Sequence, residues 1–126
     1  MTNKPPSENV AAFRGRLEPA DAVAAISPGE CSDTVRVYLR VREDVIREIS
    51  FECDGCETTV ACVAKAMELA AGRNLDEASD IAPDTVADAM GGLAPEYRHC
   101  AQVACEALSA AIMDYVFRCV EGENPL

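Results

Sequence analysis

A strictly alternating segment limits what the first half of this chain can fold into. Across residues 35–42, apolar residues at odd positions alternate with arginine or tyrosine at even positions. A period of two places one set of side chains on each face of a strand, so this segment predicts a half-buried β-strand. Glu43-Asp44 indicates a turn, and the returning run keeps most of its apolar residues on one parity, which predicts an antiparallel hairpin over 34–53. Ile46 breaks that parity, which indicates either a bulge or an exposed position.

Helical periodicity replaces the alternation after residue 56. Apolar residues recur at spacings of three and four over 60–71, and a glycine at position 72 ends the run. Asn74 followed by Glu77 is a capping-box signature, which predicts a short second helix. Before the hairpin, Val23 and Ile26 are the anchors of a short strand or an irregular segment.

Two further helices complete the predicted order. Asp84 is placed to cap a helix that ends at Gly91-Gly92. After Pro95, a long amphipathic helix is predicted from about Tyr97 to Cys119. A hairpin followed by helices is typical of α+β proteins, so we expect a small antiparallel β-sheet packed against a set of helices.

The overall composition restricts both class and function. The chain carries 11 basic and 22 acidic residues, a net charge of -11, which disfavours nucleic-acid binding because that needs a basic surface. No uninterrupted apolar run is long enough to span a membrane, and no secretory signal is expected. Seven cysteines then fit free thiols in a reducing cytoplasm better than a disulfide framework. At 126 residues we expect one domain over 13–126, after a flexible tail over 1–12.

Five residues that could bind a metal lie where predicted elements join. They are Cys31, Asp33, Cys56, His99 and Cys100. Side chains at the ends of elements can converge on one point, whereas those in the middle of a helix mostly face packing. Thiolates with an imidazole and a carboxylate suit Zn²⁺ or a small iron–sulfur cluster. Taken alone, His99 is as readily a surface residue, and Asp33 an ordinary residue at a strand start.

The other cysteines are predicted to be structural. Cys105 and Cys119 fall on the packed face of the long helix, Cys62 lies in mid-helix, and Cys53 points along its strand into the core. Cys53 and Cys56 also form a CxxC pair. A thiol–disulfide function for that pair ranks last, because the βαβ context of a thioredoxin-like motif is missing.

Three short motifs, Cys31-Ser32-Asp33, Gly55-Cys56 and His99-Cys100, occur in this order along the chain. Their combination resembles the NifU/IscU family of iron–sulfur cluster scaffolds, which carries Cys-Gly-Asp, Gly-Cys and His-Cys at similar spacing. The stretch Gly72-Arg73-Asn74-Leu75-Asp76-Glu77-Ala78 is similar to that family's Gly-Lys-x-Leu-Asp-Glu-Ala. Gly91-Gly92-Leu93 is most similar to the NifU branch. The resemblance covers roughly residues 15–115.

The resemblance implies a SufE/NifU-like fold and a scaffold or carrier rather than an enzyme. It implies that Cys31, Cys56 and Cys100 bind a transient two-iron two-sulfur cluster, with Asp33 and His99 completing or tuning the site. Iron joins sulfur delivered by a cysteine desulfurase, and acceptor apoproteins remove the cluster. Zn²⁺ can occupy the same ligands. Cys100 is the candidate sulfur acceptor, since a helix start beside a histidine and an arginine favours a thiolate.

The chain also departs from the family pattern. Ser32 replaces the glycine of the first motif, and Glu57-Thr58-Thr59 replaces small residues after the second. Tyr97 stands where the family's chaperone motif has lysine, which weighs against chaperone-assisted transfer. The alternative function is that of a zinc-bound SufU-like sulfur acceptor for a cysteine desulfurase, but that branch lacks the histidine corresponding to His99. A monomer and a cluster-bridged dimer both fit the sequence.

Overall fold

The computed structural model of the protein describes residues 13–27, 34–53, 57–92 and 94–123, except for the side chains of Glu96 and of residues 119–123. The elements in chain order are β1 (Ala22–Ile26), β2 (Val35–Arg42), β3 (Val45–Cys53), α2 (Glu57–Ala70), α3 (Leu75–Ser79), α4 (Pro83–Ala89), the 3-10 turn η1 (Pro95–Tyr97) and α5 (Arg98–Glu123). The predicted α+β class is confirmed. The segment 1–12, predicted to be a flexible tail, lies outside the described residues.

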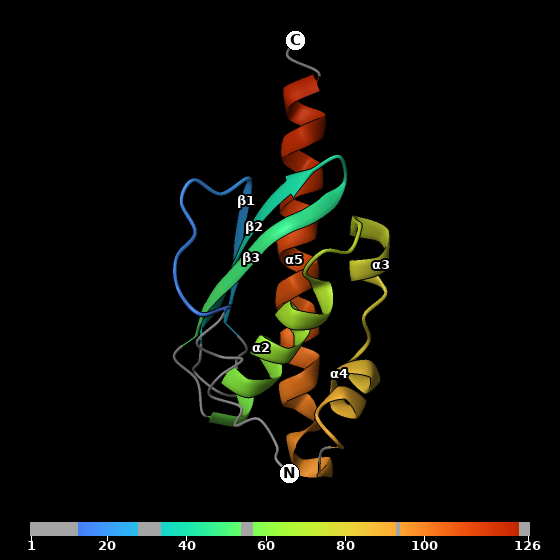
Figure 1. Ribbon diagram of the computed structural model, residues 1–126. Helices are drawn as coiled ribbons and strands as arrows, with labels where there is room; N and C mark the ends of the chain where they lie inside the picture. The colour runs from blue at the N-terminus through green and yellow to red at the C-terminus, as the bar shows by residue number, and fades with distance from the viewer. Residues whose placement is uncertain (1–12, 28–33, 54–56, 93, 124–126) are drawn as a thin grey trace.

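The strands form one antiparallel sheet in the order β1-β2-β3, so the predicted hairpin supplies its centre and one edge (Figure 1). Of the two alternatives for the segment before the hairpin, the strand is right. The pairing shifts within the hairpin, because Arg40 pairs with Glu48 while Val41 pairs with Ile46. The bulge indicated by Ile46 is therefore present, and it turns that side chain into the core, where it is fully buried.

The tip of the hairpin is bonded to the connection between α2 and α3. Glu43 and Asp44 both have positive φ angles, 57° and 64°, as a type I′ turn requires. The Leu75 amide donates to the Asp44 carbonyl, and the Ile46 amide donates to the Arg73 carbonyl, both at 2.9 Å. These bonds satisfy backbone groups at the end of the hairpin and fix α3 beside it.

Helices α2 and α3 follow the sequence prediction closely. In α2 the buried face runs along the predicted stripe, although Ala70 rather than Ala71 completes it. Asn74 caps α3, since its Oδ1 accepts from the Glu77 amide at 2.8 Å while Glu77 Oε1 accepts from the Asn74 amide at 3.4 Å. The predicted capping box is thus confirmed.

The start of α4 differs from the prediction. Asp84 is not its N-cap, because Ala82 occupies that position and Pro83 is the first helical residue. Proline is favoured there because it lacks the N–H that a helix start would leave unpaired. Asp84 instead lies in the first turn, and its carboxylate pairs with Arg98 at the start of α5.

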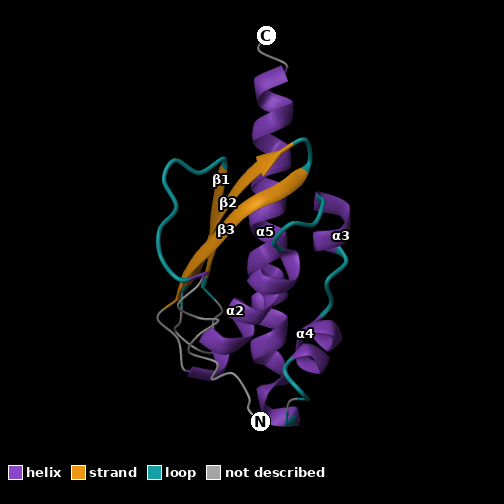
Figure 2. Ribbon diagram, viewed as in Figure 1, coloured by secondary structure: helices purple, strands orange, loops and turns teal. Residues whose placement is uncertain are grey.

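The sheet and the described helices share one apolar core. Helix α5 packs against β1 and β2 and against α2 and α4, while α2 packs against β3. Figures 1 and 2 show α5 running the length of the sheet and projecting beyond it at its C-terminal end. The largest fully buried side chains include Leu39, Phe51, Val63, Met67 and Leu108. The alternating face of the hairpin and the helical stripes therefore meet as their periodicities require.

Helix α5 is the feature that bears on the predicted absence of a membrane span. Between Arg98 and Arg118 it is long and apolar enough to meet a criterion of length and composition for crossing a membrane. Half of that window, 50%, is buried inside the protein. The core helix of a globular protein meets the same criterion, and α5 packs on the sheet as such a helix does, so it is weak evidence for a span.

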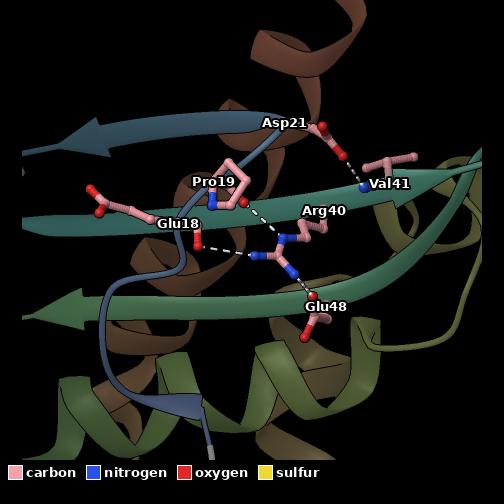
Figure 3. A network of polar contacts seen from close by, with 6 residues as sticks. All are labelled: Glu18, Pro19, Asp21, Arg40, Val41 and Glu48. Atoms are coloured by element: carbon pink, nitrogen blue, oxygen red, sulfur yellow. Dashed lines mark hydrogen bonds and ion pairs between the residues drawn. The ribbon is translucent and has the colours of Figure 1, made fainter.

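Arg40 is one of the residues that attach the segment before β1 to the outer face of the sheet (Figure 3). The Arg40 guanidinium donates through Nε to the Pro19 carbonyl at 2.7 Å and through Nη2 to the Glu18 carbonyl at 3.1 Å. Its Nη1 forms an ion pair with Glu48 on β3. Because a charged donor makes stronger hydrogen bonds than a neutral one, we expect Arg40 to contribute measurably to this attachment, beside the Gly15 amide, which donates to the Phe51 carbonyl at 2.8 Å.

Replacing Arg40 by alanine should lower the free energy of unfolding by about 1–2 kcal/mol, since two carbonyl groups lose a charged donor. Urea unfolding followed by circular dichroism measures this. Arg42→Ala is the matched control, because Arg42 is an exposed arginine of the same strand and should change stability by less than about 0.5 kcal/mol. Equal losses in the two variants would contradict the role given to Arg40.

Candidate functional site

The strand ends that flank three of the predicted ligands in sequence lie at the same end of the sheet. Ile26 at the end of β1 pairs with Val35 at the start of β2, and Val35 pairs with Cys53 at the end of β3. The connections 27–34 and 54–56 therefore both leave the sheet at this end. The predicted ligands that fall in these connections, outside the described residues, are Cys31, Asp33 and Cys56.

Helices α2 and α5 meet through their first turns. Thr59, the third residue of α2, donates its hydroxyl hydrogen bond to the sulfur of Cys100, the third residue of α5, over an Oγ1–Sγ distance of 3.3 Å. Both side chains are buried, with exposed fractions of 3% and 1%. This contact brings the His99-Cys100 motif against the stretch of chain that follows Cys56.

The two residues that precede Cys100 in α5, Arg98 and His99, are exposed. His99 is exposed, but its Nε2 lies 3.7 Å from the Cys100 sulfur. Successive helical residues diverge by about 100°, and only in the first turn can both side chains still approach one atom. Arg98 is exposed and paired with Asp84, so its charge is partly neutralised.

The electrostatic setting of Cys100 comes mainly from the backbone. The first turn of a helix carries unpaired N–H groups equivalent to about half a positive charge. Here the first turns of a 14-residue and a 26-residue helix meet at one sulfur. Although the whole chain has a charge of -11, the two helix N-termini make the local potential at this point more positive.

The donor set within the described residues is incomplete. No group of three or more histidine, cysteine, aspartate and glutamate side chains gathers as a metal site in that part of the chain. Three of the five predicted ligands belong to the connections outside it, so the ligand set stays a prediction. The soft sulfur of Cys100, with an imidazole beside it, is the part that the structure describes.

The cysteines predicted to be structural are buried as expected. Cys53 closes β3 and is 3% exposed, while Cys62 in α2 is fully buried. Cys105 lies on the packed face of α5, as predicted. The side chain of Cys119 lies outside the described residues.

Thr59 is the site residue that the sequence analysis missed. It was noted only as a departure from the family pattern, although one signal could have identified it. Thr59 precedes Val63 by four residues, so it extends the buried face of α2 by one turn and places a hydroxyl where that face is otherwise apolar. A buried polar side chain requires a partner, and Cys100 is that partner.

These features define a class: a small α+β protein that buries a cysteine where two helix N-termini meet at one end of an antiparallel sheet. Comparison with known proteins agrees. The family description "NifU-like N terminal domain" matches residues 11–121. The chain therefore belongs to the NifU N-terminal domain family, as its motifs suggested.

Individual relatives support this assignment. The chain is 38% identical over 101 residues to the iron–sulfur cluster assembly scaffold protein IscU 1 of Archaeoglobus fulgidus, a match that covers 80% of this chain and 66% of that protein. It is 34% identical over 102 residues to the nitrogen fixation protein NifU of Nostoc sp., covering 78% of this chain and 34% of that one. The chain thus spans about two thirds of the first relative and about one third of the second.

A solved structure confirms the fold. The N-terminal part of a nitrogen-fixing NifU-like protein from Brucella abortus superposes with a TM-score of 0.65 at 24% identity. The superposition covers 90% of this chain and 92% of that one. The predicted NifU-like arrangement of sheet and helices is therefore correct.

The buried thiol of Cys105 should make stability depend on pH in the alkaline range. Burial raises the pKa of this thiol from 9.0 to about 11, and the Glu106 carboxylate adds to the shift. Because the unfolded chain has the lower pKa, it loses the proton first. The stabilisation is therefore complete below about pH 9 and is lost as the pH rises through about 11.

From about pH 8 to about pH 11 this loss should reach about 2 kcal/mol. The free energy of unfolding in urea is measured for the unmodified protein and for Cys105→Ala at each pH. The difference between the two isolates the contribution of Cys105 from those of other titrating groups. Over this range the unmodified protein should lose more stability than the alanine variant does. Parallel pH profiles for the two proteins would contradict the prediction.

Proposed function

We propose that this protein is an iron–sulfur cluster assembly scaffold, a carrier that holds a cluster and gives it up. The observation that carries the proposal is the contact between Thr59 and Cys100, which joins two motif-bearing stretches 41 residues apart. Membership in the NifU N-terminal domain family and the 38% identity to an archaeal IscU scaffold protein support the same function.

The proposed ligands of the cluster are Cys31, Cys56 and Cys100, with Asp33 and His99. The short distance that the backbone can span between Cys56 and Thr59 supports this set of ligands. Cys56 is three residues before Thr59, so their Cα atoms are at most about 11 Å apart, and Thr59 contacts Cys100. Cys31 and Asp33 belong to the connection between Ile26 and Val35. Ile26 and Val35 both lie at the end of the sheet where β3 ends, just before α2.

The chemistry of these donors fits iron and sulfide. Thiolates are soft ligands for iron, and the two helix N-termini favour the negative charge of a thiolate-bound cluster. A carboxylate is a harder and weaker ligand for such a cluster than a fourth thiolate. A site with Asp33 as the fourth ligand binds its cluster weakly, as a protein that donates clusters must.

Sulfur delivery follows from the same residues. The proposed source is a cysteine desulfurase that carries a persulfide. The Cys100 thiolate attacks the outer sulfur of that persulfide, the donor's sulfur–sulfur bond breaks, and the donor cysteine leaves as a thiolate. Because Cys100 is only 1% exposed, the first turn of α5 has to become accessible to the donor before this attack. The proposed recipients of the finished cluster are apoproteins.

A zinc-bound sulfur acceptor is the alternative for the same ligands. His99, whose Nε2 lies 3.7 Å from the Cys100 sulfur, favours the scaffold because the SufU-like branch lacks the corresponding histidine. The imidazole itself suits Zn²⁺ as well as iron. Anaerobic reconstitution with iron, cysteine and a desulfurase distinguishes the two functions. Visible absorbance with iron and sulfide in equal amounts supports the scaffold, whereas zinc alone, without a cluster, supports the alternative.

Cys31→Ala, Cys56→Ala and Cys100→Ala should each abolish stoichiometric metal binding, because the proposed site has few ligands to spare. Metal analysis after anaerobic reconstitution measures this. Cys105→Ala is the control, since that cysteine lies in the core and should leave the metal content unchanged. Full metal content in all three ligand variants would reject the site.

Asp33→Ala should slow release of the cluster to an apo-acceptor, because the carboxylate provides the weakly bound and solvent-open side of the site. Stopped-flow absorbance of cluster transfer measures the rate. Asp88→Ala, an exposed carboxylate on α4, is the matched control and should transfer at the unmodified rate. Transfer that is unchanged or faster in Asp33→Ala would count against this role.

A further inference from the structure

Thr59 is the one buried polar or charged residue in the described part of the chain. Every neighbouring position on its helix face is apolar, and the next residues along it are Cys62, Val63 and Ala66. A valine would fill the same volume without the cost of burying a hydroxyl. The hydroxyl therefore needs a specific explanation, and its hydrogen bond to Cys100 provides one.

The geometry gives the hydroxyl one clear role. Both residues lie in first turns that pack against each other, so the helix backbones fix the 3.3 Å distance between oxygen and sulfur. A sulfur atom that accepts this bond keeps other lone pairs for a metal. The hydroxyl can thus remain bonded to Cys100 in both the metal-free and the ligated state.

We infer that Thr59 is a positioning residue for the Cys100 sulfur, and that its hydroxyl withdraws electron density from this sulfur when a metal is bound. The inference rests on the proposed function, in which Cys100 is a ligand. Thr59 falls in the stretch Glu57-Thr58-Thr59, directly after the proposed ligand Cys56.

The electronic consequence follows from the chemistry of thiolates. A hydrogen bond lowers the energy of the sulfur lone pairs and weakens their donation to the metal. Such bonds are among the factors that set the potential and the lability of iron–sulfur centres. Thr59 would therefore act with Asp33 in the same direction, each reducing how strongly the site holds its cargo.

Cobalt provides the test, because Co²⁺ bound to thiolate has a sulfur-to-metal charge-transfer band that reports on the sulfur. The unmodified chain, Thr59→Val, Thr59→Ser and Cys100→Ala are each titrated with Co²⁺ under anaerobic conditions. Because Cys100→Ala should bind no stoichiometric metal, loss of the band in that variant shows that the band requires the Cys100 sulfur. Valine is nearly isosteric with threonine and removes only the hydroxyl, while serine keeps it.

The expected result is a shift of the Cys100-dependent band to longer wavelength in Thr59→Val, with Thr59→Ser at the unmodified position. The serine variant separates the hydrogen bond from packing, since it restores the donor while removing a methyl group. An unmoved band in Thr59→Val, or an equal shift in both variants, would overturn the inference. A band that Cys100→Ala leaves intact would instead reject the proposed ligand, and the inference with it.

Discussion

The packing of α5 across the sheet and against α2 is the interaction on which the rest of the structure depends. It buries the apolar faces of β1, β2 and α2 together, and it sets the first turn of α5 against the first turn of α2. If α5 slid by one helical turn, about 5 Å, Cys100 would lose contact with Thr59 while the apolar stripe could still be buried. The contact between Thr59 and Cys100 therefore depends on the position of α5 along its axis relative to α2.

Burial and reactivity are combined at Cys100 in a way that distinguishes it from the other cysteines. Cys105 is also buried, and burial together with the Glu106 carboxylate raises the pKa of its thiol to about 11. Cys100 lies at two helix N-termini with a hydroxyl donor and an imidazole nearby. Both thiols therefore belong to the core, and the hydroxyl and imidazole beside Cys100 are the groups that its proposed role as a ligand uses.

Much of the fold could be predicted because it follows from local patterns. The alternation over 35–42, the bulge at Ile46 and the capping box of Asn74 are each visible in a few residues, and the structure contains all three. The cap of α4 was predicted wrongly, because the proline at position 83 competes with Asp84 for the helix start. The ligand motifs gave the family correctly, and the full ligand set stays a prediction.

The sequence alone determined which residues face the core, where α3 begins and which donor types the motifs carry, because these depend on neighbours within a few positions. Only the tertiary structure decided that Thr59 meets the Cys100 sulfur and that Arg98 pairs with Asp84. These features require residues about 14 to 41 positions apart to meet. Such meetings depend on how whole helices and strands pack, which no short stretch of sequence specifies.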